Sequence, residues 1–401
     1  MQMEFFNFLG PSFLVAVTYI DPGNYSTDIA GGVNYKYKLL VTILGASLLS
    51  VILQNLSSKI GIVTRKDLAC NCRIHFPKWV SLSLWFFIEI AIISTDLAEV
   101  IGSAIALNLL FGLPILAGVL ITSADILIIL LFFKDKVVKY FEWLTGIFVV
   151  GVGICFSILL EKSKPEFKEV LLGYVPSSFT VDEMIIALGI LGATVMPHSL
   201  FLHSNLVLKT EKSSTRKQLQ WSFWATNLAL FFAFYVNSSI LIVAGSSFFQ
   251  KEVADLQGAY SVISDTLGKF AASTFALALL FSGQTSSFIG TLAGQIVFEG
   301  FIELRISPAV RHGITRLLSI IPAVIFVSVF GQSKINNLLI YSQIVLSSLL
   351  PFAVIPLVVL SCNKRVMGDH SLGKIKMFIY GFVCIALIFI DGFLIYSFIV
   401  Q

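Results

Sequence analysis

The chain has 401 residues, of which 57% are hydrophobic and only 12% are charged, and its formal net charge is +4. This charged fraction is about half that of ordinary soluble domains, so the composition excludes a soluble protein and indicates an all-α integral membrane protein. We attribute the net positive charge to membrane topology rather than to nucleic-acid binding.

Runs of roughly 20 apolar residues recur along the whole chain, which predicts about eleven transmembrane helices in a single domain of residues 1–401. The first run has neither a basic leader nor a small-residue cleavage site, so we expect a retained helix rather than a signal peptide. The predicted spans are 7–31, 39–58, 80–110, 114–133, 141–160, 182–208, 221–245, 269–300, 314–331, 336–360 and 375–399.

Lys and Arg residues are concentrated in alternate loops and helix ends. Five segments, 59–78, 134–139, 209–217, 305–316 and 364–376, hold most of the 27 Lys and Arg residues. Because cytoplasmic loops carry an excess of these residues, the distribution predicts a multi-pass plasma-membrane protein with a cytoplasmic N-terminus. Eleven spans then place the C-terminus outside the cell.

The cysteines and the sequence motifs indicate no cofactor site. Cys70 and Cys72 form a C-x-C pair, but a structural zinc site needs a second pair of ligands. The chain also has no H-E-x-x-H zinc motif and no G-x-S-x-G nucleophile motif. We therefore expect neither a cofactor nor an enzymatic activity.

Two short polar interruptions divide apolar runs that are otherwise long enough to span a bilayer. They are Asp21-Pro22-Gly23-Asn24 and Ala193-Thr194-Val195-Met196-Pro197-His198. Hydrocarbon cannot hydrogen-bond the backbone groups that a broken helix frees, so such breaks occur only where protein buries them or where they line a wet cavity. D-P-G-N is also a common turn sequence, but here apolar helix resumes on both sides. An ionisable residue at this depth predicts a functional site.

The two breaks offer backbone oxygens. A proline in a helix has no N–H, so the carbonyl four residues earlier loses its partner. Pro22 frees the carbonyl of Thr18 in this way, and Pro197 frees that of Ala193.

The side chains at the breaks indicate a metal ion. Asp21 offers a carboxylate, Asn24 an amide oxygen and Met196 a thioether. A thioether is a soft donor that magnesium and calcium do not seek, so manganese, ferrous iron and similar ions fit best. Met196 could alternatively be a packing residue. Gln343 is a candidate extra ligand, with a helix-packing hydrogen bond as the equal alternative.

A second polar group lies on the predicted helix 80–110. Asp96 and Glu99 are three residues apart and share a helix face, and acids at bilayer depth are typical of proton relays. His198 and His203 flank the second break, and histidine changes charge near physiological pH. Arg316 could partner Asp96 if their helices are neighbours. A static ion pair or a solvated vestibule is the alternative to a relay.

The remaining intramembrane polar residues have no clear role in the sequence. Glu89, Asp125 and Asp391 could each face cavity water or a helix end, and Asn237 could make a helix-packing hydrogen bond. They stay unassigned.

The two breaks are 175 residues apart, and each opens a block of about five spans. Paired discontinuous helices at corresponding positions are typical of transporters built from inverted repeats, with the substrate between them at the bilayer midplane. We expect repeat one at about 7–160, repeat two at about 182–360, and an extra helix at about 375–399.

These residues resemble the motifs of the Nramp family, the natural resistance-associated macrophage proteins, which import divalent transition metals with protons. The similar segments are 21–24, 193–198 with His203, 95–102, 290–295 followed by 299–301, and 342–343 through 350–353. The resemblance implies a LeuT-like fold of 5+5 inverted repeats in which helices 1 and 6 are broken.

The resemblance also implies roles for individual residues. Metal binding is carried over to Asp21, Asn24, Met196 and the Ala193 carbonyl, with Thr18 and Gln343 joining in particular conformations. Proton handling is carried over to Asp21, Asp96, Glu99, His198, His203 and Arg316.

The chain departs from the family pattern at three positions. Ser199 stands where the family often has Asn, and Phe201 where it often has Tyr. Thr315 stands where a second arginine often precedes Arg316, which leaves the expected proton exit one guanidinium short. Met196 is retained, together with the histidine two residues later, which argues against the magnesium-transporting branch.

We therefore expect a proton-coupled importer of manganese or ferrous iron, and of cadmium and similar ions, that works by alternating access. Its partners would be divalent metal ions, protons and membrane lipids, with no nucleic acid and no obligate protein partner. The alternatives are a transporter of amino acids or small organic cations, which the thioether of Met196 disfavours, and a passive metal channel, which would not need two broken helices.

Overall fold

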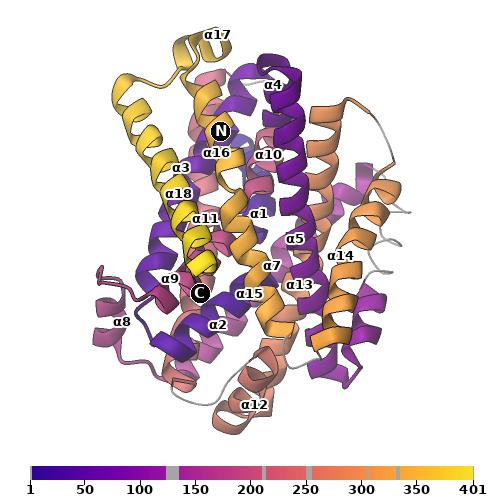
Figure 1. The fold of residues 1–401 in the computed structure, drawn as a ribbon, viewed down its shortest axis with the longest axis vertical. Coiled ribbons are helices and arrows are strands. Elements are labelled where there is room, and N and C mark those ends of the chain that lie inside the picture. Colours follow the sequence, from indigo (N-terminus) through magenta and orange to yellow (C-terminus); the bar gives the residue numbers. More distant parts are fainter. Residues whose placement is uncertain are drawn as a thin grey trace.

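The structure is a computed structural model that describes residues 2–122, 135–209, 214–249, 255–304, 307–330 and 335–400. Within these ranges the regular structure is entirely helical (Figure 1). The helices are α1 Gln2–Val17, α2 Pro22–Tyr35, α3 Leu40–Thr64, α4 Leu68–His75, α5 Lys78–Phe111, α7 Asp135–Ser163, α8 Phe167–Gly173, α9 Val181–Thr194, α10 Pro197–Leu206, α11 Thr215–Ser247, α12 Leu256–Leu267, α13 Lys269–Ile302, α14 Pro308–Phe330, α15 Ile335–Leu349, α16 Pro351–Cys362, α17 Lys364–Met367 and α18 Lys374–Val400.

The described part of every predicted apolar run is mainly helical, with interruptions at 18–21, 195–196 and 350. In the described residues, 7 helical segments are long and apolar enough to cross a membrane, and shorter apolar helices cover Phe8–Val17 and Gly313–Ile325. The run 114–133 is helical over 115–122, and its remainder, with Asp125, lies outside the described residues. The predicted all-α membrane architecture is confirmed.

The order of elements is the same in the two halves of the chain. A broken helix, α1 and α2, is followed by α3, the short α4 and the 34-residue α5. The second broken helix, α9 and α10, is followed by α11, the short α12 and the 34-residue α13. Figure 1 shows α4 and α12 at opposite ends of the molecule, as an inverted repeat requires. The boundaries of the repeats, near 7–160 and 182–360, stay a prediction.

A proline begins the second half of each broken helix. Pro22 is the first residue of α2 and Pro197 the first residue of α10. Proline fits this position because the N–H that it lacks has no partner inside the helix anyway. Each predicted break is therefore a place where one helix ends and another begins.

A third interruption lies in the predicted span 336–360, which the sequence analysis treats as continuous. The helix ends at Leu349 and resumes at Pro351. The cause is again proline, because Pro351 cannot donate to the carbonyl four residues earlier. The helical axis is nevertheless resumed at once, since the N–H groups of Ala353 and Val354 both donate to the carbonyl of Leu350.

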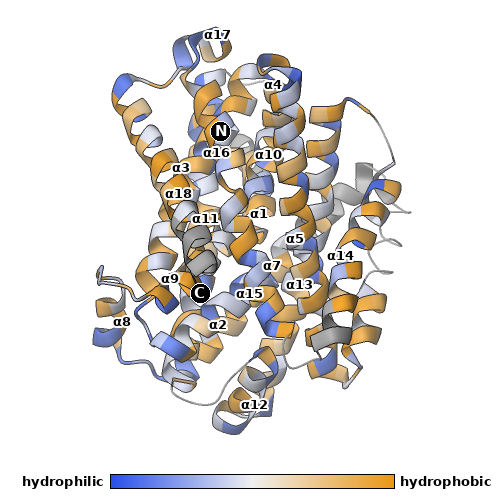
Figure 2. Ribbon diagram, viewed as in Figure 1, coloured by the Kyte–Doolittle hydropathy of each residue, from blue (hydrophilic) through white to orange (hydrophobic). Residues whose placement is uncertain are grey.

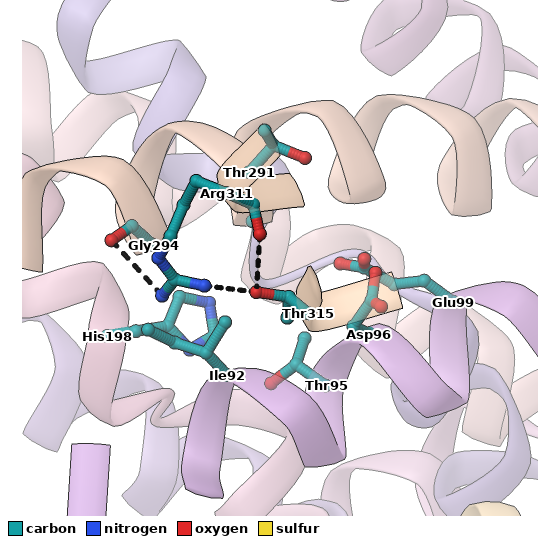
Figure 3. Close-up of a pocket in the computed structure, with 10 residues that line it drawn as sticks. Ile92, Thr95, Asp96, Glu99, His198, Thr291, Gly294, Arg311 and Thr315 are labelled. Atoms are coloured by element: carbon teal, nitrogen blue, oxygen red, sulfur yellow. Dashed lines mark hydrogen bonds between the residues drawn. The ribbon is translucent and has the colours of Figure 1, made fainter. Parts of the chain in front are cut away.

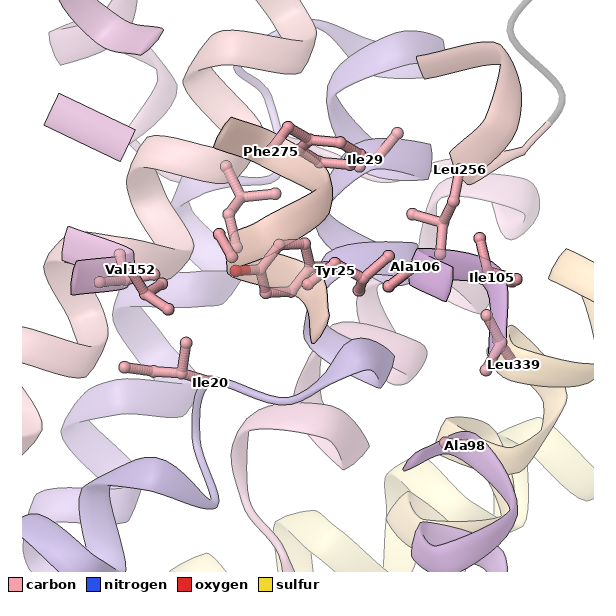
Figure 4. Packing of buried hydrophobic residues seen from close by; sticks show 14 of the residues in the cluster. Ile20, Tyr25, Ile29, Ala98, Ile105, Ala106, Val152, Leu256, Phe275 and Leu339 are labelled. Atoms are coloured by element: carbon pink, nitrogen blue, oxygen red, sulfur yellow. The ribbon is translucent and has the colours of Figure 1, made fainter. Parts of the chain in front are cut away.

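The largest apolar cluster holds the second half of the first broken helix in place. Tyr25 of α2 is completely buried, and its ring centroid lies 5.5 Å from that of Phe156 on α7 and 6.0 Å from that of Phe275 on α13. Figure 4 shows Tyr25 and Phe275 among aliphatic side chains of the same cluster. Such aromatic pairs add about 0.5–1.5 kcal/mol beyond their buried area. α2 is thus anchored between α7 and α13.

The outer surface of the helices is apolar. Large exposed side chains include Phe86 on α5, Ile147 on α7, Phe231 on α11, and Phe378 and Phe382 on α18. Figure 2 shows hydrophobic residues along these helices and hydrophilic residues at the two ends of the molecule, for example at α17 and α8. Exposed apolar surface of this extent is what a lipid-facing belt requires.

Candidate functional site

The first break places a buried carboxylate at the start of α2. Asp21 is the residue that caps this helix, and its Oδ1 accepts a hydrogen bond from the backbone N–H of Asn24 at 2.8 Å. The backbone N–H of Asp21 donates in return to Asn24 Oδ1 at 3.4 Å. Asp21 Oδ2 is buried and has no hydrogen-bond partner among the described residues. One carboxylate oxygen is thus structural, and the other is free for a ligand.

Only some of the backbone carbonyl groups between α1 and α2 accept a hydrogen bond. The carbonyl of Tyr19 accepts from Asn237 Nδ2 at 2.9 Å, and that of Ile20 accepts from the hydroxyl of Ser282. In the described part of the chain, no hydrogen bond reaches the carbonyl of Thr18. This is the carbonyl that the proline at position 22 was expected to free.

The second break contains two potential ligand groups, the thioether of Met196 and the backbone carbonyl of Ala193. Met196 is the residue that caps α10, and both Met196 and Ala193 are completely buried. The N–H of Val195 donates to the carbonyl of Leu191 at 2.8 Å, and no donor among the described residues reaches the carbonyl of Ala193. A side-chain contact joins the breaks, because Asn24 Nδ2 donates to Thr194 Oγ1 at 3.5 Å.

Gln343 on α15 reaches the first break. A Cβ atom at Gly23 would lie 2.3 Å from Gln343 Nε2, so the Gln343 side chain rests directly against the α2 backbone at this residue. Gln343 Nε2 donates to Ser342 Oγ at 3.1 Å, whereas the buried Oε1 has no partner in the described residues. Gln343 therefore brings a second free oxygen next to the first break.

The donors at the breaks differ from those of a typical protein metal site. No group of three or more His, Cys, Asp or Glu side chains that could hold a metal ion occurs in the described residues. A cation held here would have to use one carboxylate together with amide, carbonyl and thioether donors. Such a mixed set favours borderline and soft divalent ions.

The two acids of α5 contact different helices, Asp96 meeting α14 and Glu99 meeting α13. Arg316 Nη1 lies 2.8 Å from Asp96 Oδ1, and Asp96 Oδ2 accepts from the hydroxyl of Ser319. Glu99 Oε1 accepts from Ser286 Oγ at 2.6 Å, and Glu99 Oε2 is buried without a partner in the described residues. The helices of Asp96 and Arg316 are therefore neighbours, and the two side chains form an ion pair. Both acids line one cavity of about 10 Å³, which is close to the space that one water molecule needs (Figure 3).

The two histidines lie in different places. His198 lines the same cavity as Asp96 and Glu99, and its buried Nδ1 has no partner among the described residues. His203 Nδ1 instead lies 2.9 Å from Gln54 Oε1. Gln54 Nε2 also donates to Ser199 Oγ, at 2.8 Å. The structure therefore brings His198, but not His203, together with Asp96 and Glu99 of α5.

A sequence model described as natural resistance-associated macrophage protein-like, Nramp, matches residues 12–397. The chain belongs to the Nramp family. It is 47% identical over 377 residues to a divalent metal cation transporter MntH of Listeria innocua, and the match covers 91% of this chain and 84% of that relative.

Solved structures agree with this assignment. A mutant form of the Eremococcus coleocola manganese transporter has a TM-score of 0.88 and 34% sequence identity, covering 98% of this Nramp chain and 87% of that chain. The transporter Mhp1 has a TM-score of 0.63 at 13% identity, over 87% of this chain and 77% of that one, which shows a shared fold alone. The predicted Nramp resemblance and LeuT-like fold are confirmed.

One ion pair of this Nramp chain was missed by the sequence analysis. Arg311 Nη2 lies 2.5 Å from Glu89 Oε1 and 2.7 Å from Glu89 Oε2, and Arg311 Nη1 donates to the hydroxyl of Thr315 (Figure 3 shows the contact with Thr315). Arg311 lines the cavity of Asp96 and Glu99. Arg311 thus places a guanidinium in this cavity from one helical turn before position 315. The spacing of four residues on α14 could have indicated the contact of Arg311 with Thr315, but no local signal indicates Glu89.

Proposed function

We propose that this chain imports divalent transition-metal ions, manganese or ferrous iron and also cadmium, together with protons, by alternating access. The observation that carries the proposal is the pair of partnerless buried oxygens, Asp21 Oδ2 and Gln343 Oε1, beside the first break. Buried polar atoms normally have a hydrogen-bond partner, so two that lack one beside the same break are suited to a ligand. The names of the relatives, a divalent metal cation transporter and a manganese transporter, support a metal ion as that ligand.

The chemistry of the donors supports a transition metal. Asp21 supplies the one negative charge at the breaks, Asn24 and Gln343 supply amide oxygens, and Met196 supplies sulfur. A hard cation would gain more from a second carboxylate than from sulfur. The carbonyls of Thr18 and Ala193 could complete the coordination in particular conformations.

The second polar group supports coupling to protons. His198 lies two residues beyond Met196 and faces the cavity that Asp96 and Glu99 also line. We propose that protons pass between Asp21, His198, Glu99 and Asp96, and that Arg316 favours the ionised form of Asp96. His203, in its separate network with Gln54, would act indirectly through the packing of α10.

Burial of the breaks supports a transporter over a channel. Asp21, Asn24 and Met196 each have 0% of their surface exposed. A passive channel needs a continuous water path, whereas a site closed on all sides is a normal state of an alternating-access cycle. An organic-cation substrate would use Asp21 but would gain nothing specific from Met196.

The distribution of basic segments supports a proposed orientation of the protein in the membrane. The basic segments 59–78 and 364–376 lie toward the end of the molecule that carries α4 and α17, and α8 and α12 lie at the opposite end (Figure 1). We propose that the α4 end faces the cytoplasm of a plasma membrane, with the N-terminus inside and the C-terminus outside.

The test is uptake of radioactive manganese into proteoliposomes with an imposed pH gradient. We expect saturable uptake that rises when the outside is made acidic, and competition by cadmium but not by magnesium or calcium. An uptake rate that does not depend on the pH gradient would contradict proton coupling. An uptake rate that does not saturate with manganese concentration would favour a channel.

A further inference from the structure

A second cavity lies on the opposite side of α3 from the helix breaks, between α3, α11 and α18. Its volume is about 320 Å³. Residues 51–59 of α3 form one wall, residues near the start of α11 form another, and the beginning of α18 with the preceding loop forms the third. α18 packs against α16, so this cavity separates the last helix from α3 and α11.

The wall formed by α3 changes from charged to apolar. Lys59 lies near the end of α3, and Val51 and Ile52 lie about two turns earlier. At 1.5 Å per residue, the step from Lys59 to Val51 is about 12 Å along the helix. Asn55, an amide, lies between them. The order of charge, polar group and hydrocarbon is the order of groups in a phospholipid.

Two ammonium groups share the charged end of the cavity. Lys376, the third residue of α18, lines it together with Lys59, and among the described residues the lining contains no Asp or Glu. Neither lysine forms an ion pair within the described ranges of the chain. Two like charges facing one cavity repel each other, and a bound anion removes that repulsion.

The position of the cavity suits an anionic head group. Two of the five basic segments, 59–78 and 364–376, contribute residues to its lining. By their charge these segments are on the cytoplasmic side, where the leaflet carries anionic lipids, and basic pockets between transmembrane helices on that side bind anionic head groups.

We propose that this cavity is a binding site for an anionic glycerophospholipid. The phosphate lies between Lys59 and Lys376, the ester region lies near Asn55, and an acyl chain lies along Val51 and Ile52. A free phosphate ion would use only the charged end, so the apolar half of the cavity assigns the site to a lipid. The bound lipid fills the space between α18 and the helices α3 and α11.

The role of the two lysine charges is tested by native mass spectrometry. The full chain is delipidated in detergent and then titrated with phosphatidylglycerol or with phosphatidylcholine that has the same acyl chains. We expect wild type to prefer phosphatidylglycerol. The double variant Lys59→Gln/Lys376→Gln should bind it about tenfold to thirtyfold more weakly. The matched control is Lys66→Gln/Lys364→Gln, which removes the same charge from two exposed side chains at the same end. Equal losses in both double variants would overturn the proposal, since they would reflect the general surface charge.

The apolar half is tested by Ile52→Trp, which fills the cavity and keeps both lysines. We expect this variant to lose affinity for phosphatidylglycerol while its gel-filtration profile and manganese uptake stay normal. Inorganic phosphate at millimolar concentration should not displace the lipid from wild type. Displacement by phosphate, or unchanged lipid affinity in a folded Ile52→Trp protein, would overturn the assignment to a lipid.

Discussion

The side-chain amide of Asn24 donates to the hydroxyl of Thr194 across 3.5 Å. This contact connects the two helix breaks through residues that are 170 positions apart in sequence. The Asn24 side chain also accepts from the backbone N–H of Asp21, so it links the backbone of the first break to the side chain of Thr194 at the second. A ligand that draws Asn24 away from Thr194 would change both breaks together.

Asp21→Asn should reduce manganese uptake to background, because it removes the one carboxylate at the breaks. Asparagine caps a helix about as well as aspartate, so α2 should still form. Uptake is measured in proteoliposomes, and circular dichroism with gel filtration checks the fold. Wild-type uptake in a folded variant would remove Asp21 from the proposed site.

Met196→Leu should change selectivity more than transport. Leucine keeps the buried volume at a cost below about 1.5 kcal/mol, whereas alanine would also leave a cavity. Manganese uptake should persist at reduced affinity, cadmium should lose more, and calcium or magnesium should begin to compete. The quantity to measure is the ratio of cadmium to calcium competition. An unchanged ratio in both Met196→Leu and Met196→Ala would show that Met196 is a packing residue.

Asp96→Asn should keep metal binding and weaken the dependence of uptake on external pH. An amide cannot carry the proton, and its one oxygen cannot replace both of the carboxylate oxygens that contact Arg316 and Ser319. The unpaired guanidinium should also lower stability, by up to about 3–5 kcal/mol if it stays fully buried. Metal-driven acidification of the vesicle lumen reports the proton flux. Unchanged flux would exclude Asp96 from the route.

Arg311→Thr should lower the unfolding temperature, because it leaves Glu89 buried without its partner. Removing one member of a buried ion pair typically costs about 3–5 kcal/mol. The exchange variant Arg311→Thr/Thr315→Arg should recover part of this loss, since it returns a guanidinium to the position one turn along the same helix face. Thermal unfolding in detergent distinguishes the two. A single variant as stable as wild type would contradict a structural role for the pair.

His198→Gln and His203→Gln should behave differently. His198 faces the cavity of the acids, so its replacement should change the pH dependence of uptake. His203 bonds to Gln54, so its replacement should mainly cost the stability of about one hydrogen bond, roughly 0.5–1.5 kcal/mol. The pH profile and the unfolding temperature of both variants are compared. A shift of the pH profile in His203→Gln alone would reverse these roles.

The sequence by itself determined the features that depend on neighbouring residues and on bilayer thickness. Apolar runs fixed the helices, because a membrane span must satisfy its backbone internally over about 30 Å. Pro22 and Pro197 fixed the two breaks, because proline removes a backbone donor wherever it stands. The same rule applies to Pro351, where the third interruption could have been predicted.

Only the tertiary structure decided which distant side chains meet. Glu89 and Arg311 are 222 residues apart, and neither residue's local sequence reveals the other. Gln343 reaches the first break because Gly23 has no side chain to exclude it. His203 and His198 are on the same short helix, yet one faces Gln54 and the other the acids, because the neighbours of α10 differ around its circumference. These contacts depend on how helices pack, and packing is a property of the whole chain rather than of any one segment.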